Sequence, residues 1–297
     1  MASPLISIMV PCFQVAETLP TALASVRAQT YPEWECVCVD DGSSDQTWQI
    51  LRNATAADSR FRVERFERNR GRGAARQRIL ELARGDYLTF LDADDWMYPE
   101  RVERELRWLE ADRRIAAVSV GAAVTREPHE LVGTMRPRAR TAMPCTAVFE
   151  RPVPPPLLFP TTMIRMDVAK RTGFDPQFRR SQDSDFLIRA LLGRHYVLLD
   201  DLLYAYSQGV AATLPKTLEG YSYRMRAHLR HFSDHPGRVA RTVAATAMKM
   251  AVFRAAGAVG LHERLIRQRW RDADYHAQVG FRTAWERVLA ARAEFPL

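Results

Sequence analysis

The chain lacks several features that would assign it to common classes of protein. No run of about twenty uncharged apolar residues is present, and the nearest candidate, residues 239 to 261, contains Arg241, Lys249 and Arg254, so we predict no membrane span. The short apolar run at residues 5 to 10 has no basic lead, so we expect no signal peptide. The four cysteines form no CxxC pair and are predicted to be buried structural thiols in a reducing compartment.

Two further absences narrow the function. The loop after the first predicted strand, Pro11-Cys12-Phe13-Gln14, contains no glycine, whereas a nucleotidyltransferase on a similar sheet would need a glycine-rich phosphate loop there. The basic C-terminal part has no recognised nucleic-acid-binding module and no regularly interleaved aromatic residues. We therefore expect no nucleic-acid partner, and nucleotidyl transfer is only an alternative interpretation.

The charge is unevenly distributed along the 297 residues. From Lys216 onward there are 15 Lys and Arg against 7 Asp and Glu, whereas the preceding residues hold 28 of each, so the whole net charge of +8 lies in the last part. We predict a domain over residues 1–215 and a separate basic helical region over residues 216–297. Within that region, a stripe at helical spacing predicts core packing for Val239, Val243, Ala247, Met250 and Phe253.

Short apolar runs alternate with helical patterns in the first 121 residues. Strands are predicted at 5–10, 35–39, 61–66, 87–91 and 115–121, with helices at 18–29, around 48–51, and at 73–83 and 99–109. Such alternation is typical of parallel βαβ units, so the predicted fold class is α/β, with an open, mostly parallel twisted sheet flanked by helices. Residues 122–215 have a looser pattern and are predicted to form the second half of the same domain.

Three carboxylates follow the predicted strand at residues 87–91, in the run Asp92-Ala93-Asp94-Asp95. Such closely spaced negative charges are tolerable only beside a cation or several hydrogen-bond donors. Open α/β sheets bind ligands at the carboxyl ends of their strands, and hard oxygen ligands favour Mg²⁺ or Mn²⁺ bridged to phosphates. The run therefore predicts a metal–diphosphate site.

Three other clusters are predicted to lie near this edge. Asp41 follows the second strand and can accept a hydrogen bond from a nucleobase N–H, whereas Asp45 is better placed to cap the next helix. Arg72 and Arg76, in the glycine-flanked segment 69–76, are equally consistent with a diphosphate cradle and with a solvated basic turn. Asp183 is predicted in the first turn of a helix, where a lone aspartate is usually a cap.

Taken together, these motifs resemble glycosyltransferase family 2, a family of inverting enzymes that use nucleotide sugars on a single GT-A domain. The resemblance covers residues 5 to about 205. The matching segments, in order, are residues 7–13, 25–32, 40–45, 69–71, 84–87, 92–95, 173–175 and 182–183. Each motif is weak alone, but their joint order and spacing are specific.

The resemblance implies a role for each candidate residue. Asp183 would be the catalytic base, and Asp41 would contact the nucleotide base. The loop at Pro11 and Phe13 would form one side of the nucleotide-binding site. The remaining implied roles, on the nucleotide and the metal, fall to Arg72, Arg76, Asp92, Asp94 and Asp95. Of these, the arginines would offset charge on the departing diphosphate, Asp92 would lie near the ribose and the metal, Asp94 would hold Mg²⁺ or Mn²⁺, and Asp95 is a further candidate ligand.

Two positions depart from the family pattern. Gln182 stands where an acidic residue usually precedes the base, and residues 203–208 contain no histidine to act as a further metal ligand.

The implied activity is an inverting, metal-dependent transfer of a sugar from a nucleotide sugar, expected to be a UDP-sugar, to an acceptor hydroxyl. The sugar would be a hexose or an N-acetylhexosamine, and the acceptor a glycan or glycolipid of a surface-polysaccharide pathway. A non-catalytic nucleotide-binding relative is the alternative. We expect a cytoplasmic protein whose basic segment contacts the inner face of the membrane, or instead forms a solvated face or a homodimer surface.

Overall fold

The computed structural model describes residues 3–137, 142–178, 180–207, 214–258, 260 and 270–295. Its first part alternates strands and helices, as the sequence predicts. The strands are β1 (Ile6–Cys12), β2 (Trp34–Asp40), β3 (Phe61–Arg65), β4 (Tyr87–Phe90), β5 (Trp96–Met97) and β6 (Ile115–Thr125). The helices are α1 (Leu19–Arg27), α2 (Thr47–Ala57), α3 (Arg72–Leu82) and α4 (Arg101–Ala111).

The second part adds mostly antiparallel strands to the same sheet. It contains β7 (Leu131–Met135), β8 (Cys145–Val148), β9 (Thr162–Arg165), α5 (Met166–Thr172), α6 (Gln182–Leu191) and β10 (His195–Ser207). The strand order is β3-β2-β1-β4-β9-β6-β10-β5, with β7 paired to β6 and β8 to β10. Strands β3, β2, β1 and β4 are mutually parallel, as are β6 and β10, and β9 is antiparallel to both of its neighbours. The predicted α/β class with a mostly parallel sheet flanked by helices is confirmed.

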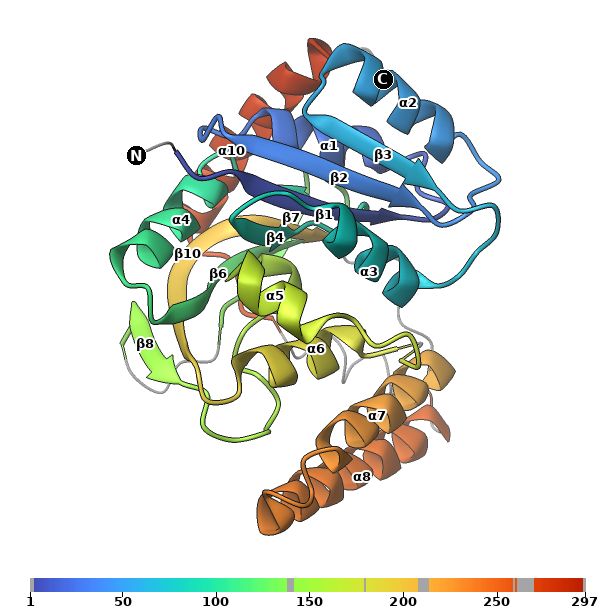
Figure 1. The fold of residues 1–297 in the computed structure, drawn as a ribbon, viewed down its shortest axis with the longest axis vertical. Coiled ribbons are helices and arrows are strands. Elements are labelled where there is room, and N and C mark those ends of the chain that lie inside the picture. Colours follow the sequence, from blue (N-terminus) through green and yellow to red (C-terminus); the bar gives the residue numbers. More distant parts are fainter. Residues whose placement is uncertain are drawn as a thin grey trace.

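Helices cover both faces of the sheet, and each face has its own hydrophobic cluster (Figure 1). On one face, α1, α2 and α4 bury side chains such as Leu23, Leu51 and Val102. On the other face, α3, α5 and α6 bury Ile79, Val168 and their neighbours. Two-sided burial explains why β1 and β2 are continuous apolar runs rather than alternating ones.

The C-terminal residues form two separate structures. Helices α7 (Leu214–Leu229) and α8 (Pro236–Ala258) make a hairpin that projects from one end of the molecule (Figure 1). Helix α10 (Tyr275–Ala293) instead packs on α1, and its Phe281 and Val288 join the core of that face. No helix within the described part of the chain combines the length and apolarity needed to cross a membrane.

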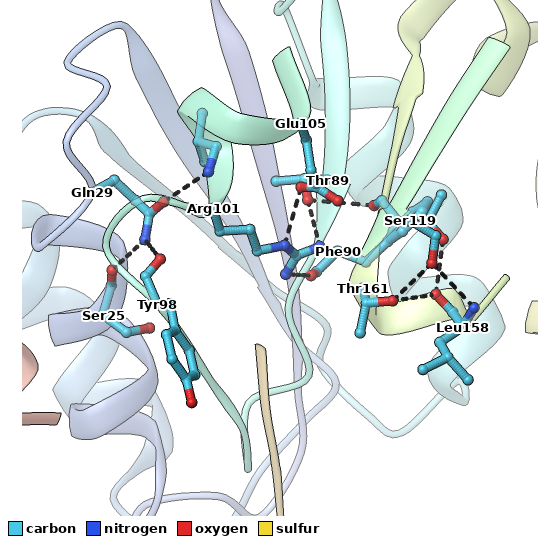
Figure 2. Close-up of polar contacts among 12 residues, drawn as sticks. Ser25, Gln29, Thr89, Phe90, Tyr98, Arg101, Glu105, Ser119, Leu158 and Thr161 are labelled. Carbon is cyan, nitrogen blue, oxygen red and sulfur yellow. Dashed lines mark hydrogen bonds and ion pairs between the residues drawn. The ribbon is translucent and has the colours of Figure 1, made fainter. Parts of the chain in front are cut away.

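A buried ion pair on α4 is hydrogen-bonded to β4 (Figure 2). The Arg101 guanidinium and the Glu105 carboxylate, one turn apart on α4, are both fully buried and 3.1 Å apart. Arg101 also donates to the Phe90 carbonyl (3.0 Å) and to the Thr89 hydroxyl (2.8 Å) on β4. This network fixes the strand that leads into the aspartate run, because a buried charge needs all of its partners.

We expect Arg101→Leu to lower the free energy of unfolding by about 3–5 kcal/mol, because it leaves the buried Glu105 carboxylate unpaired. The double variant Arg101→Leu/Glu105→Leu should be less destabilised than the single variant, which urea unfolding followed by circular dichroism will measure. Arg107→Leu is the matched control, since the Arg107–Glu103 pair lies one turn away on the solvent side of α4. Its loss should cost at most about 0.5 kcal/mol.

The destabilisation by Arg101→Leu should also increase with pH. Burial outweighs the attraction of Arg101 and raises the pKa of Glu105 to about 7. A carboxyl whose pKa is raised in the folded state stabilises that state below its unfolded pKa, and this contribution is lost as the pH rises through the folded pKa. Removing Arg101 raises that pKa further, so the variant continues to lose stability at pH values where the wild type no longer does. A difference in the free energy of unfolding between the two proteins that stays the same from pH 5 to pH 8 would contradict this account.

Candidate functional site

The loops that follow β1, β2 and β4 meet at one edge of the sheet, because these three strands are adjacent and parallel. Asp41 is buried there and holds the loop before α3: its carboxylate accepts hydrogen bonds from the backbone N–H groups of Arg70 (2.6 Å) and Gly71 (2.9 Å). Burial outweighs these donors and raises the pKa of Asp41. The sequence did not predict this structural use of both carboxylate oxygens, although each oxygen retains a lone pair for a further donor.

Gly42 allows the close approach of these two loops. Its φ is +75°, and a Cβ at this position would lie 2.8 Å from the backbone carbon of Arg68. A side chain here would therefore separate the loop after β2 from the loop that Asp41 binds.

Asp92 and Arg76 form the innermost ion pair of the site. The Arg76 guanidinium, which is 4% exposed, lies 3.0 Å from Asp92 Oδ1 and over the ring of Phe159 at 4.4 Å. Burial alone would raise the pKa of Asp92, but Arg76 and Arg72 together hold it below its usual value. Asp92 is therefore ionised at neutral pH.

Asp94 and Arg72 are the exposed charged groups of the same edge, and neither forms an ion pair with a residue in the described part of the chain. The neighbouring protein atoms partly desolvate the Asp94 carboxylate, and this desolvation together with the charge of Asp92 raises the pKa of Asp94. The pKa of the Arg72 guanidinium is raised above all by Asp92. The negative charges of Asp94 and Asp183 also raise the pKa of Arg72, so both carboxylates lie within Coulombic reach of this one side chain.

Asp95 joins the aspartate run to β10. It is buried, and its carboxylate accepts from the Tyr204 hydroxyl (2.6 Å) and from the Ser207 backbone N–H (2.7 Å), both on β10. The Tyr204 hydroxyl is also 3.2 Å from the backbone nitrogen of Asp92. The role of Asp95 as a further metal ligand stays a prediction.

Asp183 lies in the first turn of α6, directly beside the start of α3. A Cβ on Gly73 would meet the Gln182 side chain at 3.4 Å, which shows how closely the two helix ends approach. Ser181, the residue that precedes α6, has a left-handed backbone (φ +53°), and its hydroxyl donates to the Gly220 carbonyl of α7 at 2.9 Å. The position of Asp183 therefore depends on a loop that α7 holds.

Phe13 extends the edge on the β1 side. Its ring is 44% exposed, next to the partly exposed Pro11 at the end of β1. The backbone N–H of Gln14 donates to the Ser43 hydroxyl (3.0 Å), which ties this loop to the loop after β2. An exposed aromatic ring at this position can stack on a planar ligand.

The acidic residues fit a metal ion only together with a ligand. In the described residues, no group of three or more His, Cys, Asp or Glu side chains is arranged to hold a metal by itself. Mg²⁺ typically binds through one or two carboxylates and completes its shell with phosphate oxygens and water. The exposed carboxylate of Asp94, with that of Asp92 two residues away, fits this mode of binding.

Sequence reasoning missed two residues that organise the site, Tyr204 and Arg101. Tyr204 is fully buried and joins β10 to the aspartate run, and Arg101 anchors β4 below it. Neither lies in a recognisable motif, and their roles follow only from contacts between distant segments.

Comparison with known proteins identifies a common family. Residues 7–171 match the family model for glycosyl transferase family 2. An uncharacterized glycosyltransferase, MJ1057 from Methanocaldococcus jannaschii, is 26% identical over 209 residues, which cover 69% of this chain and 71% of that protein. The amylovoran biosynthesis glycosyltransferase AmsB from Erwinia amylovora is 25% identical and is covered over 68% of its length. Two glycosyltransferases from Bacillus subtilis, EpsH and EpsE, match over 31% and 46% of theirs.

Solved structures agree with the fold. A mannosyltransferase from Pyrobaculum calidifontis, in complex with GDP-Man and Mn²⁺, superposes with a TM-score of 0.62 at 18% identity, covering 99% of this chain and 87% of that one. Residues 1–349 of Staphylococcus aureus TarS, in complex with UDP-GlcNAc, give 0.59 at 18% identity, with 95% and 90% covered. The expected GT-A fold is confirmed.

We expect Tyr204→Phe to lower the free energy of unfolding by about 1–3 kcal/mol, because the buried Asp95 loses a hydrogen-bond donor that no water can replace. Thermal and urea unfolding will measure the change. Tyr275→Phe provides the control, since Tyr275 is 73% exposed and should tolerate the loss of its hydroxyl. Equal stability of both variants would show that the Tyr204 hydroxyl does not carry this contact.

Proposed function

Because the chain belongs to glycosyltransferase family 2, we propose that it transfers a sugar from a nucleotide-sugar donor to an acceptor hydroxyl with inversion at the anomeric carbon. The observation that carries this proposal is the close approach of the start of α6, which carries Asp183, to the start of α3, which carries Arg72. The charges of Asp94 and Asp183 both act on Arg72. A transferase of this kind needs a cation for the diphosphate, a carboxylate for a metal and a second carboxylate for the acceptor proton.

The donor would lie across the loops after β1, β2 and β4. The N-terminus of α3 faces this edge, so its free backbone N–H groups and Arg72 favour a diphosphate. Phe13 and Pro11 would wall the base, and Asp41 would accept from its ring N–H. We propose a UDP-sugar, which the TarS complexes with UDP and UDP-GlcNAc support, and a guanine base would offer the same N–H.

Asp183 would act as the general base. It takes the proton of the acceptor hydroxyl while that oxygen bonds to the anomeric carbon, and the bond to the diphosphate oxygen breaks with its electron pair. Arg72 offsets the charge that develops on the departing diphosphate, whereas Arg76 is already paired with Asp92. Gln182 beside the base is neutral, so it places no second negative charge next to Asp183.

Asp94 and Asp92 would hold the divalent ion, Mg²⁺ or Mn²⁺. When bound, such an ion supplies Lewis-acid stabilisation of the diphosphate. The complex of the Pyrobaculum enzyme with Mn²⁺ supports this assignment.

We further propose that residues 1–121 bind the nucleotide sugar, that residues 122–215 bind the acceptor, and that residues 216–297 form the basic region. The acceptor would be a glycan or glycolipid of surface-polysaccharide synthesis. Among the relatives, WfaP from Escherichia coli is a UDP-Glc:alpha-D-GlcNAc-diphosphoundecaprenol beta-1,3-glucosyltransferase, 29% identical over 109 residues that cover 43% of its length.

Asp183→Asn should reduce sugar transfer by about 10²–10⁴-fold, because an amide cannot accept the acceptor proton, while donor binding is retained. Transfer is measured as nucleotide release in the presence of acceptor, and binding as the shift in the thermal unfolding midpoint. Asp167→Asn, in the first turn of the neighbouring helix α5, is the control and should leave both unchanged. Normal turnover by Asp183→Asn would remove this residue from catalysis.

A panel of UDP-, GDP- and dTDP-sugars, each with and without Mn²⁺, tests the donor and the metal together. We expect one nucleotide class to raise the unfolding midpoint, more strongly with Mn²⁺, because a ligand stabilises the state that it binds. EDTA or Asp94→Asn should remove the effect of Mn²⁺, whereas Asp201→Asn, an exposed acidic residue of β10, should not. No stabilisation by any member of the panel would contradict the proposed donor.

A further inference from the structure

Helix α8 forms the outer layer of the C-terminal hairpin. It packs against α7, which in turn contacts α6, so α7 lies between α8 and the rest of the molecule (Figure 1). The inner side of α8 buries Val239, Met250 and Phe253, and a small cluster joins the last two to Tyr221 of α7. The opposite side of α8 is exposed in the described structure, and its composition indicates what could cover it.

That outer side is apolar. Met248 is 68% exposed and Val252 is 48% exposed, and at helical spacing they lie on one stripe with three exposed alanines, Ala244, Ala245 and Ala255. Two more exposed apolar side chains, Leu229 and Phe232, lie at the turn between α7 and α8. Four of the nine large apolar side chains that are exposed in the described chain therefore belong to this hairpin.

The charge on α8 has one sign. The helix contains Arg238, Arg241, Lys249 and Arg254 and no acidic residue, and none of the four forms an ion pair with another described residue. Residues 214–258 together hold eight Lys and Arg against two acidic residues. At helical spacing Arg241 lies on the stripe itself, one turn before Ala244 and Ala245, and Arg238 and Lys249 lie beside it. Because long basic side chains can extend along an apolar surface to the headgroups, this arrangement is typical of a helix that lies in a membrane interface.

We propose that the outer side of α8 docks on an anionic lipid surface. Met248 and Val252 would enter the acyl boundary, and the four basic side chains would lie at the level of the headgroups. The proposal deepens the proposed function, because it names the surface on which the enzyme would meet a lipid-linked acceptor. Only this link to an acceptor rests on the proposed function, and the docking itself does not.

The charge also argues against two other occupants. A second copy of the chain, paired through this face by a two-fold axis, would bring two helices of equal positive charge together without acidic partners. A nucleic acid would pair with the basic side chains but would leave the Met248–Val252 stripe without an apolar contact. An anionic membrane satisfies both the charge and the stripe.

Helix α7 connects this face to the loop that precedes α6 and Asp183. Arg230 at the end of α7 forms ion pairs with Asp175 and, at 3.3 Å, with Asp185 of α6. Arg226 donates to the Gln177 side chain at 2.8 Å, and Ser181 donates to the α7 backbone. A docked α8 would therefore hold the acceptor side of the site at a fixed distance from the lipid surface.

Flotation of the full-length chain with vesicles tests the proposal. We expect binding to vesicles of phosphatidylglycerol and phosphatidylcholine at low salt, weaker binding at about 0.5 M salt, and little binding to phosphatidylcholine alone. Met248→Glu/Val252→Glu should abolish flotation. Arg241→Gln/Lys249→Gln should weaken the partition coefficient by about fivefold for each charge removed.

Val279→Glu/Leu289→Glu is the matched control, because these residues are apolar, 38% and 42% exposed, and belong to α10 rather than to the hairpin. This variant should float like the wild type, and circular dichroism checks that all variants are folded. Failure of the wild type to float at low salt, or unchanged flotation of the α8 variants, overturns the proposal. A dimer in light scattering that Met248→Glu/Val252→Glu converts to a monomer also overturns it, since the face then belongs to a second copy.

The two proposals fail separately. Donor binding is measured by the unfolding midpoint with nucleotide sugar and no vesicles, and the α8 variants should bind donor like the wild type. Loss of flotation with intact donor binding removes the membrane surface and leaves the transferase. Flotation without any donor binding removes the transferase and leaves the membrane surface.

Discussion

The ion pair between Arg76 and Asp92 is the contact on which the site depends. Asp92, Asp94 and Asp95 follow β4 within four residues, and without opposite charge they would repel one another. The structure treats each of them differently: Arg76 neutralises Asp92, β10 binds Asp95 with two hydrogen bonds, and Asp94 is left exposed. Asp95 and Asp92 therefore hold the edge together, Asp94 is open to a ligand, and Asp92 uses only one of its two oxygens for Arg76.

Helix α3 brings the other charged groups to the same edge. Asp41 fixes the loop before α3, the first residue of α3 is Arg72, and one turn later Arg76 reaches Asp92. The start of α6, with Asp183, then packs against Gly73 of α3. A single helix end thus places the loop that Asp41 binds, the Arg72 guanidinium and the proposed base relative to one another, and small shifts of α3 would move all three together.

Local patterns predicted the first half of the molecule well, because each βαβ unit buries its own strand and helix. The site edge followed from the same reasoning, since aspartates after adjacent parallel strands must meet. The antiparallel insertion of β9 between β4 and β6 was not predictable, because pairing of distant strands leaves no local signal. For the same reason the sequence did not distinguish Asp95, which Tyr204 binds from 109 residues away, from its neighbours. The predicted core stripe of α8 is confirmed at Val239, Met250 and Phe253, whereas Val243 is only partly buried and Ala247 is exposed. The sequence did not indicate that the other side of α8 would be left uncovered.

The docking of α10 has a consequence for how the chain reaches this structure. Phe281 and Val288 complete the core over α1, and Phe295 stacks on Phe61 of β3 at 5.4 Å with the Arg27 guanidinium on the same ring. The sheet face under α1 is therefore completed by residues that lie far later in the chain. During synthesis this face stays open to solvent until α10 emerges, so its core closes only after β1 to β10 have all been made.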